Sequence, residues 1–126
     1  MFLAEQVYNI LGRILDMRMR KMKNRDSRME RCGELRIADP AALKGNWRSL
    51  KPDCTALWVE VGCGKGKFTA ETAAANPDVL LIAVERCREA MVVAMEKAQG
   101  MGLKNVFFID MDVANIEDIF AGFEID

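Results

Sequence analysis

The feature that most constrains this sequence is a glycine-rich segment, residues 62–66, that directly follows a short apolar run. Residues 56–61 are apolar except for Glu60, which is typical of a buried strand. The segment after the glycines predicts a helix over 66–75. A buried strand that turns into a helix through glycines is typical of the ligand-binding edge of an open α/β sheet. We therefore expect a binding site at this turn, and a tight turn without a ligand is the alternative.

The remaining elements continue the same alternation. Apolar runs predict further buried strands at 79–84 and 105–109, and helical spacing predicts a helix over 87–99 between them. A short helix is expected near 115–121. The apolar stripe of the second helix consists of Met91, Ala94, Met95 and Ala98. Strand, helix, strand, helix, strand is the first half of a doubly wound sheet, with three parallel strands and right-handed crossovers.

Acidic residues follow the second and third predicted strands. Glu85 lies 23 positions after Gly62, where a carboxylate commonly accepts hydrogen bonds from both ribose hydroxyls of a nucleoside. Asp110 and Asp112 follow the third strand at the same edge of the sheet. Either aspartate can accept from an adenine amino group or cap the next helix, and a solvated strand-end charge is the alternative for Glu85.

Glu60 distinguishes between two kinds of nucleoside ligand. A carboxylate beside the glycines favours S-adenosylmethionine, which carries an ammonium and a sulfonium group, and repels the pyrophosphate of NAD. The spacing G-x-G-x-G also differs from G-x-G-x-x-G, and the phosphate-binding G-x-x-x-x-G-K-[ST] spacing is absent. We expect Glu60, Glu85 and an aspartate after the third strand to face one hollow beside the glycines.

Charge is distributed unevenly along the chain. Residues 1–52 carry 12 basic and 6 acidic side chains, and residues 53–126 carry 6 basic and 13 acidic ones. Such asymmetry suggests that the front of the chain contacts a polyanion, although a solvated arm is an equal alternative. Candidate nucleic-acid contacts are Arg18, Arg20, Lys21, Lys23 and Arg25. The expected organisation is an amphipathic extension at 1–16, a basic arm with a G-x-W segment at 17–53, and a ligand-binding half-domain at 54–126.

Composition excludes several other classes of protein. A length of 126 residues allows one small domain. Four cysteines without C-x-x-C spacing, and no histidine, argue against a zinc site and against His-based catalysis, so free thiols are expected. No apolar run approaches the ~20 residues that span a bilayer. No signal peptide is recognisable, so a cytoplasmic protein without membrane contact is expected.

Short segments spread over residues 17–126 match one family pattern. They are Glu60 to Phe68, Asn76-Pro77, Glu85, Gly102 to Val106 and Asp112, with Met-Arg-Met-Arg-Lys at 17–21 and Lys44-Gly45-Asn46-Trp47. Together they resemble the bacterial tRNA (guanine-N7)-methyltransferases. The glycine loop alone fits any class I methyltransferase, and the arginine-rich start and G-x-W element make the likeness more specific.

The resemblance implies a Rossmann-like class I methyltransferase fold, of which this chain holds the first βαβαβ half. It implies methyl transfer from S-adenosylmethionine to N7 of a guanine in the tRNA variable loop. By this likeness the methyl donor contacts Glu60, Glu85 and Asp112, and Gly62 and Gly64 lie close to its amino-acid end. The basic tract at 18–31 would lie toward the donor site and the tRNA.

The chain departs from the family pattern at its end. Family members continue with a Phe-Ser-Asp-Pro-Trp-Pro type strand that carries the catalytic aspartate, whereas this sequence stops at Asp126. We therefore expect no catalytic residue within the chain and no activity of the chain alone. The missing strand would pair with residues 56–61, which leaves an open apolar edge that can self-associate. The alternatives are a non-catalytic fragment that binds S-adenosylmethionine or RNA, another class I methyltransferase, and half of a nicotinamide-dependent oxidoreductase.

Overall fold

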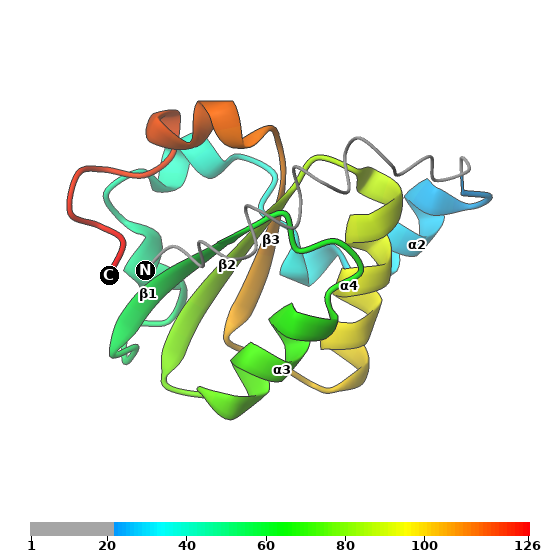
Figure 1. Ribbon diagram of the computed structural model, residues 1–126, viewed down its shortest axis with the longest axis horizontal. Coiled ribbons are helices and arrows are strands. Elements are labelled where there is room, and N and C mark those ends of the chain that lie inside the picture. The colour runs from blue at the N-terminus through cyan, green and yellow to red at the C-terminus, as the bar shows by residue number, and fades with distance from the viewer. Residues whose placement is uncertain (1–21) are drawn as a thin grey trace.

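The computed structural model describes residues 22–126, and a sheet of three parallel strands lies at its centre (Figure 1). The strands are β1 (Ala56–Val61), β2 (Val79–Glu85) and β3 (Val106–Asp110), paired in the order β1-β2-β3. The sequence predicted all three strands and their parallel direction, and each boundary agrees to within one residue. This arrangement confirms the expected α/β class and is the first half of a Rossmann-like sheet.

Two helices connect the strands and a third lies outside them. The connecting helices are α3 (Lys67–Ala75) and α4 (Arg88–Gly100), and both agree with their predicted limits to within one residue. The third, α2 (Arg25–Arg31), forms within the basic tract and lies beside α4, where its Met29 joins the core that α4 shares with the sheet (Figure 1). The predicted extension at 1–16 lies outside the described residues.

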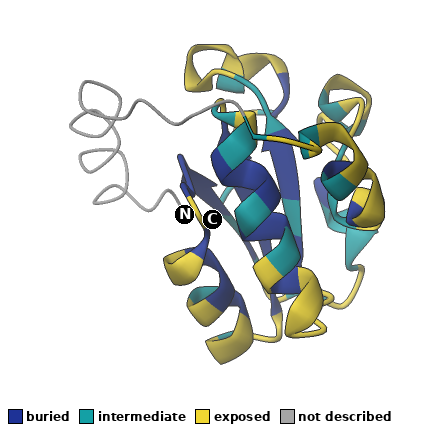
Figure 2. Ribbon diagram, turned by 90° about the vertical axis from the view of Figure 1, so that its right-hand side faces the viewer, coloured by how far each residue is buried: buried dark blue, intermediate teal, exposed yellow. Residues whose placement is uncertain are grey.

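Side chains alternate across the sheet and build a core on each face. On one face the strands meet α3 and α4, and the predicted stripe of α4 is fully buried there. The buried residues of that stripe are Met91, Ala94, Met95 and Ala98. Figure 2 shows the strands largely buried, with the exposed surface of the helices turned outward. All seven residues of β2 are buried. Because both faces of this strand are covered, its sequence is a continuous apolar run up to Glu85 and does not alternate with polar residues.

The opposite face is covered by short 3₁₀ turns instead of α-helices. These turns are η2 (Pro40–Leu43), η3 (Trp47–Leu50) and η4 (Val113–Asp118). A further turn, η1 (Gly33–Leu35), follows α2, and its Leu35 packs on the core of the α3 and α4 face. The helix expected near 115–121 begins two residues earlier and is a 3₁₀ turn. It begins there because the side chain of Asp112 accepts a hydrogen bond from the Ala114 N–H, at 3.0 Å, and caps the turn.

The G-x-W segment ties this second layer together. Trp47 is completely buried, and its indole N–H donates to the Ile119 carbonyl at 2.6 Å. The ring stacks on Phe120 with centroids 5.0 Å apart. The Glu124 carboxylate accepts backbone hydrogen bonds from Gly45 at 3.0 Å and from Trp47 at 3.3 Å. Segments more than 70 residues apart are thereby fixed against each other.

The outer side of β1 borders no other strand among residues 22–126, which fits the expected open edge. The chain nevertheless returns to this edge at its last residue (Figure 1). The Asp126 N–H donates to the Leu57 carbonyl at 2.9 Å, and the Leu57 N–H donates to the Asp126 carboxylate at 2.7 Å. Arg48 also pairs with this carboxylate. The edge of β1 thus already accepts one residue in strand-like pairing.

We predict that Gly66→Ala destabilises the fold by about 3 kcal/mol. Gly66 has a φ of +81°, and a Cβ atom placed on it would lie 2.4 Å from the Cβ of Ala94 in α4. Urea unfolding measures the change. Gly100→Ala is the matched control, because no atom lies within 4 Å of its added Cβ and alanine favours the helix by up to about 1 kcal/mol. Equal stability of the two variants would contradict the close approach of the loop to α4.

Candidate functional site

The glycine loop lies where the carboxyl ends of β1 and β2 meet. Gly62, Gly64 and Gly66 all have positive φ, between 56° and 81°, which residues with side chains adopt only at a cost. The Gly62 N–H donates to the carbonyl of Val84 in β2, which anchors the start of the loop. The sequence predicted this position for the loop, and its backbone conformation explains the glycine spacing.

Glu60 is a carboxylate that is fully removed from solvent, with 0% of its surface exposed. It occupies the α3 side of β1, where the hydroxyl of Thr69 donates to its Oε1 at 2.9 Å. Its Oε2 accepts no hydrogen bond from any residue that the structure describes. Burial raises the pKa of Glu60 to about 7, the charge of Glu85 adds to the rise, and the Thr69 hydrogen bond opposes it. An unpaired buried oxygen of this kind favours a cationic partner.

Glu85 connects the two loops at this edge of the sheet. One carboxylate oxygen accepts the Gly64 N–H at 2.9 Å, and the other accepts the Cys87 N–H at 3.0 Å. Glu85 is also close enough to Glu60 for their charges to interact. Both acids surround the Cys63 thiol, and burial raises the pKa of that thiol well above its ordinary value, so Cys63 stays a neutral thiol.

The two aspartates at the end of β3, Asp110 and Asp112, have different surroundings. Asp110 aligns with Glu85 in the sheet, but its carboxylate pairs with the guanidinium of Arg88. Asp112 caps η4 and lies 3.6 Å from the guanidinium of Arg86, and about half of its side chain remains exposed. The sequence left both aspartates open as helix caps, and the structure assigns the cap to Asp112.

The predicted nucleic-acid contacts fall partly inside the described residues. Arg18, Arg20 and Lys21 lie outside them. Lys23 is exposed at the start of the described chain, whereas Arg25 donates to Glu89 of α4 at 2.8 Å. Arg28 likewise pairs with Glu96 of α4. These ion pairs use two positive charges of α2 to attach it to α4, so fewer charges remain for an external polyanion.

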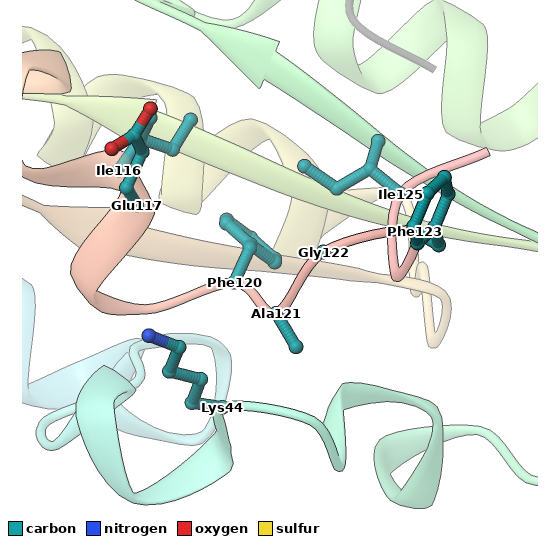
Figure 3. A pocket seen from close by; sticks show the side chains of 8 residues that line it. All are labelled: Lys44, Ile116, Glu117, Phe120, Ala121, Gly122, Phe123 and Ile125. Carbon is teal, nitrogen blue, oxygen red and sulfur yellow. The ribbon is translucent and has the colours of Figure 1, made fainter.

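An apolar hollow of about 510 Å³ lies beside η4, on the face of the sheet away from α3. Figure 3 shows Ile116 and Ile125 extending toward one another with Phe120 between them, while Lys44 reaches in from η2's end. Phe123 at its rim is fully exposed and has a φ of +64°, which a bulky side chain seldom adopts.

Three hollows are lined by residues other than the predicted acids. They lie beside η4, beside α2 and beside Gly45, and none of these three is lined by Glu60, Glu85 or Asp112. The structure brings Glu60 and Glu85 together around the glycine loop, whereas the Asp112 side chain pairs with Arg86, the residue after Glu85. A shared hollow for all three acids therefore stays a prediction.

Sequence reasoning missed the residues that hold these acids in place. Thr69 hydrogen-bonds Glu60, and Arg88 pairs with Asp110. Thr69 could have been found, because a hydroxyl in the first turn of the helix after the loop faces the preceding strand. The pairing of Arg88 with Asp110 could not have been found from the sequence, because it joins positions 22 residues apart on different elements.

Two further observations concern the described residues as a whole. Within residues 22–126 no helix combines the length and apolar character that a bilayer crossing requires. In the same range no three His, Cys, Asp or Glu side chains gather as they do around a metal ion.

Comparison with protein families agrees with the fold and with the loop. Residues 55–125, more than half of the chain, match the family described as "Putative methyltransferase". This range contains the three strands, α3, α4 and the glycine loop with both glutamates. The Rossmann-like half-sheet and the acid-flanked loop define the class, and the chain belongs to this methyltransferase family.

Curated relatives make the likeness more particular. The chain is 32% identical over 109 residues to the tRNA (guanine-N(7)-)-methyltransferase of Bacillus velezensis, which covers 86% of this chain and 50% of that protein. It is 38% identical over 92 residues to the enzyme of that name from Halalkalibacterium halodurans, covering 73% and 42%. It is 36% identical over 110 residues to the enzyme of that name from Clostridioides difficile, and the match covers 86% of this chain and 51% of that protein. The predicted resemblance is confirmed, and the chain spans about half the length of the curated relatives it matches.

We predict that Glu60→Gln stabilises the protein at pH 8 by up to about 3 kcal/mol. A folded-state pKa of about 7, against 4.5 for an ordinary glutamate, means that protonated Glu60 favours the folded state. That stability is complete below pH 4.5 and is lost as the pH rises through 7, and glutamine has no proton to lose. Urea unfolding at pH 8 and at pH 4.5 measures the difference, which should vanish at the lower pH.

The exposed Glu71 of α3 provides the control for this substitution. Glu71→Gln should change the free energy of unfolding by less than about 0.5 kcal/mol at either pH. If Glu60→Gln is less stable than the parent protein at pH 8, then Glu60 is not a desolvated, partly unpaired carboxylate.

Proposed function

We propose that this chain forms the donor-binding half of a tRNA (guanine-N7)-methyltransferase, with S-adenosylmethionine as the methyl donor. The single observation that carries the proposal is the buried Oε2 of Glu60, which lacks a hydrogen-bond partner among the described residues and lies beside the glycine loop. The names of the relatives support the choice of methyl acceptor. The family match supports methyl transfer as the type of reaction.

The residues at the loop fit a positively charged adenosyl compound. An ammonium group on the Glu60 Oε2 would supply the missing hydrogen bond and would hold the carboxylate in its charged form. Glu85 uses both oxygens for backbone N–H groups, but a carboxylate has about four acceptor sites and can still receive ribose hydroxyls. Two glutamates in one small volume would repel a pyrophosphate, which argues against a nicotinamide cofactor.

Access to Glu60 requires a local movement. Because its side chain is fully buried, a donor ammonium reaches Oε2 only if the glycine loop shifts away from α3. The loop is attached to β2 through Gly62 and to Glu85 through Gly64, so binding at the ribose position and loop movement are coupled. We propose that a donor held by Glu85 displaces the Gly64 N–H and thereby opens the path to Glu60.

Methyl transfer makes modest demands on the protein. The sulfonium group of the donor supplies an activated methyl group, so the protein must chiefly hold donor and acceptor in line and keep water out. In this chain Glu60 and Glu85 would fix the donor, and Asp112 at the end of β3 would approach its adenine. Asp112 has half of its side chain exposed and can turn from Arg86 toward a ligand.

The other parts of the proposal concern partners and location. We assign the basic arm at 17–53 to tRNA contact, supported by its net positive charge and by the relatives' names. No other strand of residues 22–126 pairs with the outer edge of β1, and we propose that a further strand or a second copy pairs there in place of Asp126. A cytoplasmic location accompanies the tRNA substrate and is part of the same proposal.

We predict that S-adenosylhomocysteine binds about tenfold more weakly at pH 6 than at pH 8. The ligand ammonium pairs with ionised Glu60, and a pKa near 7 leaves only a small ionised fraction at pH 6. Isothermal titration calorimetry measures the affinity. Glu60→Gln should bind more weakly at pH 8 and lose the pH dependence, whereas Glu71→Gln should behave as the parent protein. Binding that is independent of pH and of Glu60 would overturn the donor site.

We also predict that residues 1–126 alone transfer no methyl group to tRNA. An in-line transfer needs a guanine held opposite the donor, and the residues proposed at the glycine loop, Glu60, Glu85 and Asp112, hold the donor and leave the guanine without a partner. Incubation with radiolabelled S-adenosylmethionine and unmodified tRNA, followed by precipitation of the RNA, measures transfer. Label incorporated above a sample that lacks protein would show that this chain contains a complete acceptor site.

A further inference from the structure

A hollow of about 500 Å³ lies between α2, the segment at 33–38 and the start of α4. Its size is that of a site for a small organic ligand. Two arginines, Arg36 and Arg88, line it, and two carboxylates of α2, Asp26 and Glu30, also line it. None of the loop contacts described for Glu60 and Glu85 involves these residues.

Asp110 holds the two arginines in one place. The Arg88 Nε donates to the Asp110 carboxylate, and an Nη atom of Arg36 lies 3.9 Å from the same oxygen. Only 12% of the Asp110 side chain is exposed, so this carboxylate forms the floor beneath two guanidinium groups. Asp110 alone cannot neutralise both arginines, so the Arg36 and Arg88 side of the hollow keeps a net positive charge, opposite the acidic wall of Asp26 and Glu30.

Arg36 has a donor that no described residue satisfies. Its Nε–H is buried and has no hydrogen-bond partner within residues 22–126. The backbone beside it is fixed, because Arg36 forms a bridge with Phe108 at the outer edge of β3 and the Ile37 N–H donates to the Phe108 carbonyl at 2.9 Å. A buried charged donor without an acceptor is costly, and a small turn of the Arg36 side chain toward the hollow would let an anionic oxygen there relieve that cost.

The opposite wall limits which anion fits. Asp26 and Glu30 would repel a ligand that is acidic throughout, such as a dicarboxylate. A nucleotide combines both requirements, because its phosphate offers oxygens to the arginines and its ribose hydroxyls donate to carboxylates. We propose that this hollow binds one nucleotide of an RNA strand, with its phosphate on Arg36 and Arg88 and its ribose toward Glu30.

RNA is the source of the nucleotide because the hollow adjoins the basic tract. Its α2 wall belongs to residues 17–31, which carry seven positive and two negative side chains, and five positive side chains remain in this tract besides Arg25 and Arg28, which pair with α4. This step rests on the proposed function only in taking RNA as the partner. The site itself is separate from the glycine loop, so the two proposals can fail independently.

The test uses the whole chain labelled with ¹⁵N, and follows the arginine Nε–Hε signals by NMR during titration with a short single-stranded RNA and with 5′-GMP. We expect the signals of Arg36 and Arg88 to move with the RNA, and a response to GMP would show that a single nucleotide is sufficient. RNA binding that leaves both signals unmoved would overturn the site, as would the absence of any RNA binding.

Affinity of variants provides a second measurement. Arg36→Lys keeps the charge but removes the planar donor group, and it should weaken RNA binding about tenfold by fluorescence anisotropy. Arg48→Lys is the matched control, because Arg48 pairs with Asp126 on the other side of the sheet. The RNA affinity of this control variant should stay within about twofold of that of the parent protein. Equal losses in both variants would contradict a specific site. Calorimetry with S-adenosylhomocysteine on the same samples reports separately on the donor site.

Discussion

The carboxylate of Glu60 is removed from water at the end of a buried strand, with only one of its two oxygens hydrogen-bonded among the described residues. A charge in that position is stable only if a proton or a cation accompanies it. The rise of its pKa to about 7 expresses this requirement in the structure without a ligand. A strand optimised for folding alone would carry valine or isoleucine here, so the position favours function over stability.

The surrounding fold keeps this carboxylate in place. The parallel pairing of β1 with β2 brings the ends of both strands to one edge, and the glycine loop crosses that edge. Gly66 lets the loop approach Ala94 of α4 so closely that no side chain fits between them. Glu85 then closes the edge by accepting an N–H from each neighbouring loop. Movement of the loop therefore involves both glutamates together.

Most of the fold could be predicted from the sequence because it depends on local patterns. Continuous apolar runs fix the strands, and the stripe of α4 fixes the face that it buries. The acids at the strand ends could also be placed, since parallel strands end at one edge. Their partners could not: the pairing of Asp110 with Arg88, and of Glu124 with the G-x-W segment, joins residues that are distant in the chain. Asp112 caps η4, which is one of the two alternatives that the sequence left open, and its contact with adenine stays a prediction.

The most direct measurement of the central claim is the carboxyl ¹³C chemical shift of Glu60, titrated with and without saturating S-adenosylhomocysteine. The account predicts a pKa near 7 for the free protein and a fall of at least about one pH unit with the ligand, because an ammonium on Oε2 stabilises the charged form. An ordinary glutamate value in the free protein, or a pKa that the ligand leaves unchanged, would contradict it.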